Sequence, residues 1–389
     1  MNSYNRYQLS PAEQNLTNQL KQIIIHEIEN SNMGVISFAR YMELALYYPQ
    51  LGYYSNGLFK FGKEGDFITA PLVSNVFGHL IAHQLQELFC HQVAPIILEF
   101  GAGNGKLCCD ILASLGDTIE NYYILELSAN LQLWQSELLA SKVPQYAHKV
   151  VWLDRLPDNF NGVILANEVL DAQPCNLIQF TNEANLVEMG VKVTSNQKLA
   201  CEPFSSNTKA VEHLRNFGLK YSNYTSEVNL RSLGFINSLA DCLSSGAVLL
   251  IDYGYGASEY YHPERSNGTL RGFFRHNLID DVLLYPGLCD ITASVEWSSL
   301  VNQAEKVNLD LVGYTNQANF LINCGLTSLL EQAQANLPEE QYLILTKQIN
   351  QLIAPNIMGE AFKVCGLSKN LKFTNWLGFS HGDRSYALT

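Results

Sequence analysis

The chain has 389 residues, 47% of them hydrophobic and 16% charged, which excludes a disordered protein and predicts one large domain with additions or two domains. Its net charge of −13 argues against a nucleic-acid backbone as the main partner, because phosphate binding requires clustered Lys and Arg. The nine cysteines contain no CxxC pair and the nine histidines no metal-ligand spacing, so we expect free thiols and no metal site.

No targeting signal is evident in the sequence. The first residues, MNSYNRYQLS, contain no apolar core and are not rich in arginine, and no apolar stretch approaches ~18 residues. We therefore expect a cytoplasmic protein that does not associate with a membrane.

Residues 1–94 are predicted to form an N-terminal helical region. Ser37 is a suitable cap for a second helix that ends before Pro49, and Pro71 is predicted to open a third helix after a long loop rich in glycine and aromatic residues. The first helix is indicated by apolar residues at helical spacing: Leu16, Leu20, Ile23, Ile24 and Ile28.

From Pro95 onward the pattern changes to short buried strands that alternate with helices. Polar side chains stand near the ends of four of these strands: Glu99, Glu126, Asp154 and Asn167. Open parallel α/β sheets bind ligands at the carboxyl ends of their strands, so the pattern predicts a doubly wound α/β sheet with its site at that edge. The five predicted strands read PIILEF, NYYILELS, KVVWLD, GVILAN and AVLLIDYG.

The predicted core is interrupted by an insertion. Residues 95–174 are expected to form its first part, and residues 175–245 an inserted subdomain that begins with β-like alternation and ends in the helical stretch TSEVNLRSLGFINSLADCLSS. Residues 246–389 are expected to complete the core, to add a wall for the substrate, and to end in amphipathic helices near 317–335 and 339–353.

A glycine-rich loop after the first strand points to a bound cofactor. Glu99 is followed by Gly101, Gly103 and Gly105, and such glycines let the backbone approach a ligand at the start of the next helix. The dinucleotide fingerprint requires its third Gly or Ala at the position of Lys106, which disfavours NAD and favours S-adenosylmethionine.

Three polar residues at the following strand ends are the predicted partners of that cofactor. Glu126 offers two acceptor oxygens to the two ribose hydroxyls of an adenosine group. Asp154 is a candidate acceptor for the adenine amino group, although a plain loop aspartate is the alternative, and Asn167 completes the cofactor-binding set.

Several blocks, taken in this order, resemble the MidA-like (DUF185) family of S-adenosylmethionine-dependent methyltransferases. The resemblance implies a class I methyltransferase core with N-terminal helices, an inserted α+β subdomain and C-terminal helices, and no tightly bound metal. The mitochondrial member of that family dimethylates an arginine of a respiratory NADH dehydrogenase subunit, so a protein partner is implied. The matching blocks are GDFITAP, LEFGAGNGKL, ANEVLDAQP, IDYGYG, the segment 268–300 and the helical tail through MGE.

The family resemblance also implies roles for individual residues. It suggests that the loop containing Asp66 closes over the cofactor, whereas a turn aspartate is the alternative. The segment 268–300, which contains His276 and Asp290, has the mixed aromatic content of a substrate wall. His276 is a candidate for moving a proton, but a lone histidine is more often structural.

Two carboxylates after the fourth strand are the main catalytic candidates. An arginine acceptor is protonated in water, so an enzyme that methylates it must orient it and remove a proton. Glu168 and Asp171 are suited to both tasks. The alternative is a purely structural role, in which they face solvent or cap a turn.

Four functions remain open from the sequence: a protein arginine methyltransferase, a small-molecule methyltransferase, an assembly factor that binds S-adenosylmethionine without turnover, and an NAD-linked oxidoreductase. Lys106 disfavours the last of them. The apolar faces of the C-terminal helices permit a homodimer but serve equally well as core.

Overall fold

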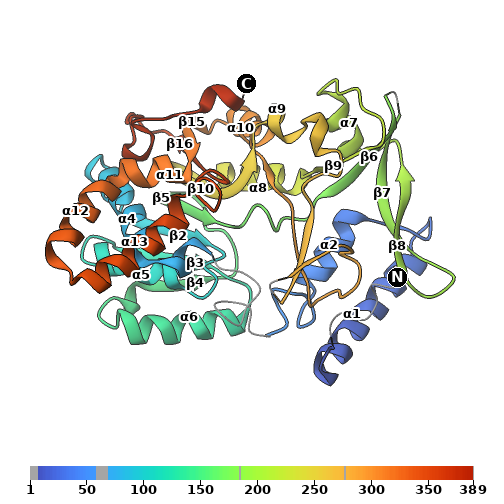
Figure 1. Cartoon of the computed structure of the whole chain (residues 1–389), viewed down its shortest axis with the longest axis horizontal. Coiled ribbons are helices and arrows are strands. Elements are labelled where there is room, and N and C mark those ends of the chain that lie inside the picture. Colours follow the sequence, from blue (N-terminus) through green and yellow to red (C-terminus); the bar gives the residue numbers. More distant parts are fainter. Residues whose placement is uncertain (1–7, 58–68, 184, 276, 389) are drawn as a thin grey trace.

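The computed structural model describes residues 8–57, 69–183, 185–275 and 277–388. Its centre is a large sheet whose strands lie in the order β15, β16, β10, β5, β2, β3, β4 (Figure 1). The strands β2 to β5 and β10 pair in parallel, and β16 and β15 are antiparallel additions at one side. Their bounds are Ile96–Phe100 (β2), Asn121–Leu125 (β3), Val150–Leu153 (β4), Phe160–Asn167 (β5), Leu243–Tyr255 (β10), Asp310–Asn316 (β15) and Phe362–Lys369 (β16).

Successive residues of the central strands point to opposite faces of this sheet, and helices cover both faces. Ile97 of β2 packs into one apolar cluster and Leu98 into the other. The first cluster includes residues of α4 (Asn75–Cys90), α5 (Lys106–Leu115) and α6 (Ala129–Lys142). The second includes residues of α8 (Leu230–Cys242) and α10 (Trp297–Lys306). The doubly wound α/β class is therefore confirmed.

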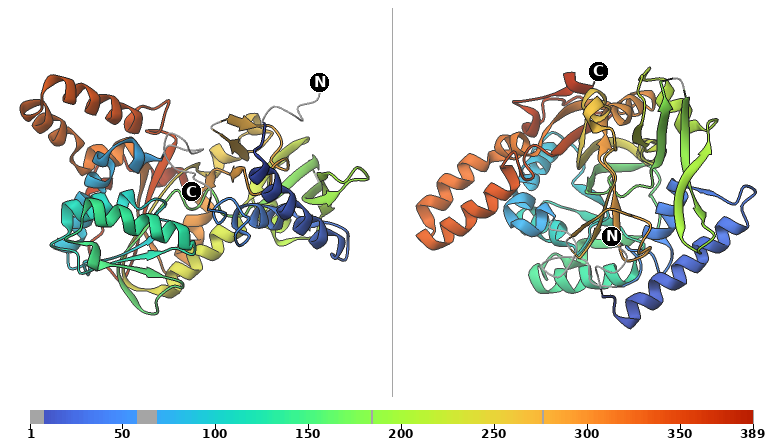
Figure 2. Two further views of the ribbon diagram at one scale, coloured as in Figure 1. Left: turned by 90° about the horizontal axis from the view of Figure 1, so that it is seen from below. Right: turned by 45° about the vertical axis from the view of Figure 1, so that its right-hand side comes forward.

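A second lobe lies beside the main sheet and combines the start of the chain with segments from its middle (Figures 1 and 2). Its largest sheet runs β1-β7-β6-β9, with β8 paired to β7. The helices α1 (Pro11–Glu29) and α2 (Phe38–Tyr47) pack there, and Ser37 caps α2 as predicted. The strands are Ile36–Ser37 (β1), Asn176–Asn182 (β6), Asn185–Val193 (β7), Leu199–Ser205 (β8) and Tyr224–Val228 (β9), with the helix Lys209–Arg215 (α7).

A small three-stranded sheet joins this lobe to the main one. Its order is β12-β11-β13, with bounds Asn277–Ile279 (β12), Arg271–Phe274 (β11) and Asp290–Thr292 (β13). The short strand β14 (Val295–Glu296) then pairs in parallel with the end of β10. The segment 268–300 thus leads from the second lobe back to the carboxyl end of the main sheet.

Four sequence-based expectations were wrong in detail. The stretch predicted as helix at the end of the insertion begins with strand β9, and only α8 is helical. The helix predicted from Pro71 is two helices, α3 (Ala70–Val73) and α4, because Ser74 has an extended backbone with φ −159° and caps α4 instead. The strands β15 and β16 were not predicted at all.

The fourth error concerns the stretch 317–335. It is divided into α11 (Gln317–Leu321), a kinked segment over Ile322–Leu326 and α12 (Thr327–Asn336), because Gly325 has φ 103°, which an α-helix does not permit. The last long helix is α13 (Glu339–Ile353), close to its predicted range. Figure 2 shows α12 and α13 projecting as a hairpin from the main lobe.

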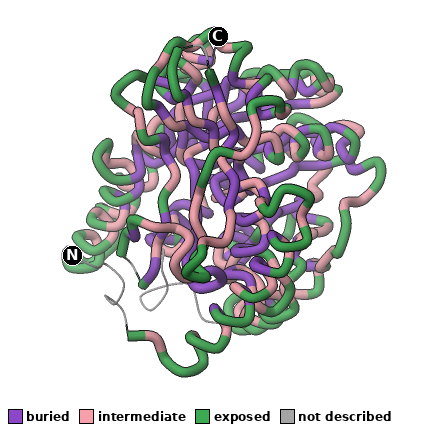
Figure 3. Tube along the Cα trace, turned by 90° about the vertical axis from the view of Figure 1, so that its right-hand side faces the viewer, coloured by how far each residue is buried: buried purple, intermediate pink, exposed green. Residues whose placement is uncertain are grey.

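Short elements complete the described chain. Buried segments run through the interior and exposed ones form the rim (Figure 3). Among the described residues, no helix has the length and apolarity needed to cross a membrane, and no cluster of His, Cys, Asp or Glu is arranged to hold a metal ion. The short elements are the helix Ala257–Tyr260 (α9) and the 3-10 turns Ala147–Lys149, Pro263–Arg265, Leu377–Phe379 and Ser385–Leu388.

Candidate functional site

The glycine loop lies at the carboxyl end of β2 and has the backbone that its sequence predicts. Gly101, Gly103 and Gly105 have φ values of 57°, 55° and 84°, a region that side chains with a Cβ rarely adopt. Gly105 is also the N-cap of α5. The positive φ at Gly105 favours glycine, and a Cβ there would lie 3.1 Å from Cγ of Gln135, a tight contact.

Gln135 of α6 connects the glycine loop with the ends of the next two strands. Its amide nitrogen donates to the carbonyl of Gly103 at 2.9 Å and lies 3.4 Å from the Glu126 carboxylate. Its amide oxygen accepts from the indole of Trp152 at 2.7 Å. Gln135 is fully buried, and sequence reasoning missed it because a glutamine within a helix gives no sign of burial.

Glu126 stands just after β3, beside the glycine loop. The amide of Ser128 donates to one of its oxygens at 2.9 Å. Burial raises the pKa of the carboxyl, although the hydrogen bonds from Ser128 and Gln135 partly offset this effect. The next residue, Leu127, is 80% exposed, which is unusual for a large apolar side chain and was not anticipated. The pair presents a carboxylate and an apolar surface side by side.

Glu99 and Asp154, also predicted to bind the cofactor, occupy contrasting positions. Glu99 lies within β2 and is 2% exposed, and the hydroxyl of Tyr122 donates to it at 2.7 Å. Burial raises the pKa of Glu99 to about 7, an effect that the Tyr122 hydrogen bond partly offsets. Glu99 therefore links β2 to β3 within the sheet. Asp154 follows β4 and is exposed.

The carboxyl end of β5 brings Asn167 and Glu168 next to the glycine loop, where Val169 would contact a Cβ at Gly101. Asn167 donates from its amide nitrogen to Oε1 of Glu168 at 3.2 Å. Its amide oxygen is buried and has no hydrogen-bond partner among the described residues. Such an acceptor is costly to leave unpaired, so it indicates a ligand donor.

Glu168 is held in a strained conformation. Its φ is 54°, which is rare for a residue with a Cβ and typical of functional sites. Its amide donates to the carbonyl of Ile251 at 2.9 Å, and its carboxylate lies 3.4 Å from the amide of Ala70. Burial and the neighbouring charge of Asp171 raise the pKa of Glu168 to about 8.

Asp171 and Asp252 form the next layer behind Glu168. Asp171 is 6% exposed and accepts from the hydroxyl of Tyr253 at 2.8 Å, and burial raises its pKa to about 6. Asp252 is fully buried and accepts from the amides of Leu170 and Asp171 at 2.8 and 3.1 Å. Asp252 thereby fixes the loop that presents Glu168. Asp252 was not predicted from the sequence, although it lies near the end of the fifth predicted strand.

The opposite side of this carboxylate group comes from the second lobe. Asp290, at the start of β13, is 4% exposed and accepts from the hydroxyl of Tyr54 at 2.9 Å. Tyr47, the last residue of α2, donates from its hydroxyl to the carbonyl of Ala172 at 2.9 Å. The predicted substrate wall thus contributes Asp290, whereas Asp66 and His276 lie outside the described residues.

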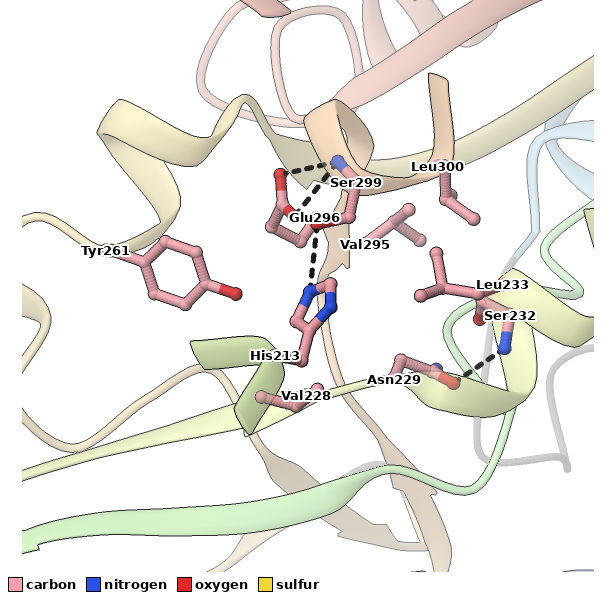
Figure 4. A pocket seen from close by; sticks show the side chains of 10 residues that line it. All are labelled: His213, Val228, Asn229, Ser232, Leu233, Tyr261, Val295, Glu296, Ser299 and Leu300. Atoms are coloured by element: carbon pink, nitrogen blue, oxygen red, sulfur yellow. Dashed lines mark hydrogen bonds between the residues drawn. The ribbon is translucent and has the colours of Figure 1, made fainter. Parts of the chain in front are cut away.

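A pocket elsewhere in the structure is unrelated to this group. It lies between α8 and α10, and Figure 4 shows His213 pointing toward Ser299, with Nε2 and Oγ 3.2 Å apart. Glu296 accepts from the amides of Ser298 and Ser299 and so caps α10. Glu296 thus stabilises the start of α10, and His213 contacts a residue of the same first turn. Because these contacts are structural, we assign no function to the pocket.

Comparisons with known proteins agree with the site. A family model described as "Putative S-adenosyl-L-methionine-dependent methyltransferase" matches residues 76–315. The mouse protein named protein arginine methyltransferase NDUFAF7, mitochondrial, is 30% identical over 90% of this chain and 85% of its own length. The human protein of that name is 28% identical over 92% and 85%. A Burkholderia thailandensis protein, crystallised with S-adenosyl-homocysteine, is 35% identical, with a TM-score of 0.91 over 98% of this chain and 99% of its own.

Proposed function

Because the chain belongs to this family of S-adenosylmethionine-dependent methyltransferases, we propose that it transfers methyl groups to an arginine side chain of a protein partner. The observation that carries the proposal is the group of carboxylates at the end of β5 and β10, next to the glycine loop. Such a group suits a cationic acceptor. The names of the mouse and human relatives agree with an arginine acceptor.

The residues near the glycine loop fit S-adenosylmethionine. Gly101 and Gly105 leave open backbone where a Cβ would meet neighbouring side chains, and Glu126 offers two oxygens to a ribose. Leu127 offers an exposed apolar surface for the adenine ring. When bound, S-adenosylmethionine supplies a methyl group on a sulfonium, whose sulfur keeps the electron pair of the broken bond.

Glu168 is suited to remove a proton from the acceptor. A guanidinium is protonated in water, so the nitrogen that attacks the methyl group must lose one proton to the base, and the product is a methylated guanidinium. With a pKa of about 8, the ionised carboxylate of Glu168 is a stronger base than an ordinary one, and the fraction that is ionised accepts the proton. Asp252 holds the loop that carries Glu168, so the carboxylate is in place before the acceptor arrives.

Labelled methyl transfer tests this function. The purified protein is incubated with S-adenosylmethionine labelled in its methyl group and with an extract of its own cells, and label in protein is measured. We expect label with the wild type, and at least 100-fold less with Glu168→Gln, since general-base catalysis contributes about 10²–10⁴-fold. Equal labelling by both proteins would contradict the role of Glu168, and label in small molecules alone would contradict a protein acceptor.

Two further predictions remain part of the proposal. A cytoplasmic location is one of them, whereas the mouse and human relatives are named as mitochondrial. A homodimer through the C-terminal helices is also a prediction: Leu343 and Ile344 of α13 are 52% and 51% exposed. Sedimentation of the wild type and of a Leu343→Glu variant measures it.

A further inference from the structure

An exposed aromatic ring stands among the carboxylates of the site. Tyr47 is 41% exposed, whereas its hydroxyl is fixed by the carbonyl of Ala172, one residue after Asp171. Burial raises the pKa of that hydroxyl, with Asp171 and Asp290 as the nearby charges. The hydroxyl end of Tyr47 is therefore deep and close to both carboxylates, while part of its ring is open.

A second tyrosine supports this ring from behind. Tyr47 and Tyr54 stack with ring centroids 5.5 Å apart and an interplanar angle of 24°. Tyr54 is itself held by its hydrogen bond to Asp290 and by an edge contact with Tyr53 at 5.0 Å. The two anchors fix the plane of Tyr47, so it presents a preformed flat surface rather than a mobile side chain.

Within the part of the chain that the structure describes, no Lys, Arg or His forms an ion pair with the nearest carboxylates. Glu168, Asp171 and Asp252 take part in none of the ion pairs formed by the described residues, which instead involve other acids. Beside Glu168, the buried amide oxygen of Asn167 also lacks a donor within the described chain. The site thus combines a flat ring, a carboxylate and a neutral acceptor.

We propose that Tyr47 is the surface on which the acceptor side chain stacks, and that it selects a guanidinium over an ammonium group. This inference rests on the proposed function and assigns its choice of acceptor. A guanidinium is planar, stacks on aromatic rings, and offers two N–H groups on one edge to the adjacent acceptors of Glu168 and Asn167. An ammonium is a compact, strongly hydrated charge that gains little from the flat ring.

Peptide binding to the full chain tests the proposal. The blocked peptides Gly-Gly-Arg-Gly-Gly and Gly-Gly-Lys-Gly-Gly are titrated calorimetrically into protein saturated with S-adenosyl-homocysteine. We expect the wild type to bind the arginine peptide about tenfold more tightly than the lysine peptide. Tyr47→Leu should remove most of that preference, and Tyr47→Phe, which keeps the ring, should retain it. Tyr386→Leu, at another exposed tyrosine, is the control and should bind like the wild type.

Equal binding of the two peptides by the wild type would overturn the proposal whatever the variants do. An unchanged preference in Tyr47→Leu would also overturn it. The affinity of each variant for S-adenosyl-homocysteine is measured as a control, because an unchanged affinity shows that the cofactor-binding site is still folded. Suppose that the wild type forms methylarginine in cell proteins, but Tyr47→Leu still prefers the arginine peptide: then only the role of Tyr47 is wrong. If the wild type methylates only another kind of residue, the proposed function itself is wrong.

Discussion

The substitution Glu126→Gln tests the cofactor half of the site. The amide keeps the size of the side chain but replaces two charged acceptor oxygens by one neutral oxygen. Hydrogen bonds to charged groups contribute about 1.5–3 kcal/mol each and neutral ones about 0.5–1.5 kcal/mol. If each ribose hydroxyl exchanges a charged for a neutral partner on the amide, the loss is about 2–3 kcal/mol, which is roughly a 30- to 150-fold weaker affinity.

The fold should tolerate this change. Burial raises the pKa of Glu126, so the ionised carboxylate is disfavoured in the folded chain, and its neutral replacement removes that cost. Calorimetric titration with S-adenosyl-homocysteine measures the affinity. Glu120→Gln is the matched control, because Glu120 is exposed at the opposite end of the same strand, just before β3. A Glu126→Gln variant within threefold of the wild type would refute the ribose assignment.

Other predictions concern the acceptor half and the glycine loop. Because Glu168 must be ionised to accept a proton and its pKa is about 8, the rate of methyl transfer should rise with pH through about 8. Asp171→Asn removes a charge that raises this pKa, so the rise should move to lower pH; a pH–rate profile that stays in place would contradict the coupling. Gly105→Ala should lower the free energy of unfolding by about 1–2 kcal/mol, because it forces a left-handed backbone on a residue with a Cβ. The control is Gly234→Ala, in the exposed middle of α8, which should raise the free energy of unfolding by up to ~1 kcal/mol. Urea unfolding measures both variants, and a similar loss of stability in Gly105→Ala and Gly234→Ala would contradict the role of the left-handed backbone.

The features that the sequence predicted well are those encoded locally. Three glycines at fixed spacing after an apolar run require positive φ, so the loop at Gly101, Gly103 and Gly105 could be located without the structure. Glu126 and Glu168 could be named because each directly follows a buried strand, where parallel sheets gather their ligands.

The features that sequence reasoning missed depend on contacts between distant segments. Tyr47 reaches the site from a segment far from Glu168 in the chain, and no local pattern reveals its neighbours. Asp290 was predicted only as part of the substrate wall, without its hydrogen bond to Tyr54. Gln135 reads as an ordinary helix residue until α6 packs against the loop. The strand β16 is a short apolar run after two helices, and only its pairing with β10 distinguishes it from a helix segment.

The most direct test of the account is to identify the amino acid that receives the methyl group. Protein labelled by the purified enzyme with S-adenosylmethionine is hydrolysed completely, and the labelled amino acids are separated and identified by mass spectrometry. The account predicts methylarginine, formed by the wild type and lost in Glu168→Gln. Label confined to methyllysine or to another residue would contradict the assignment of the acceptor.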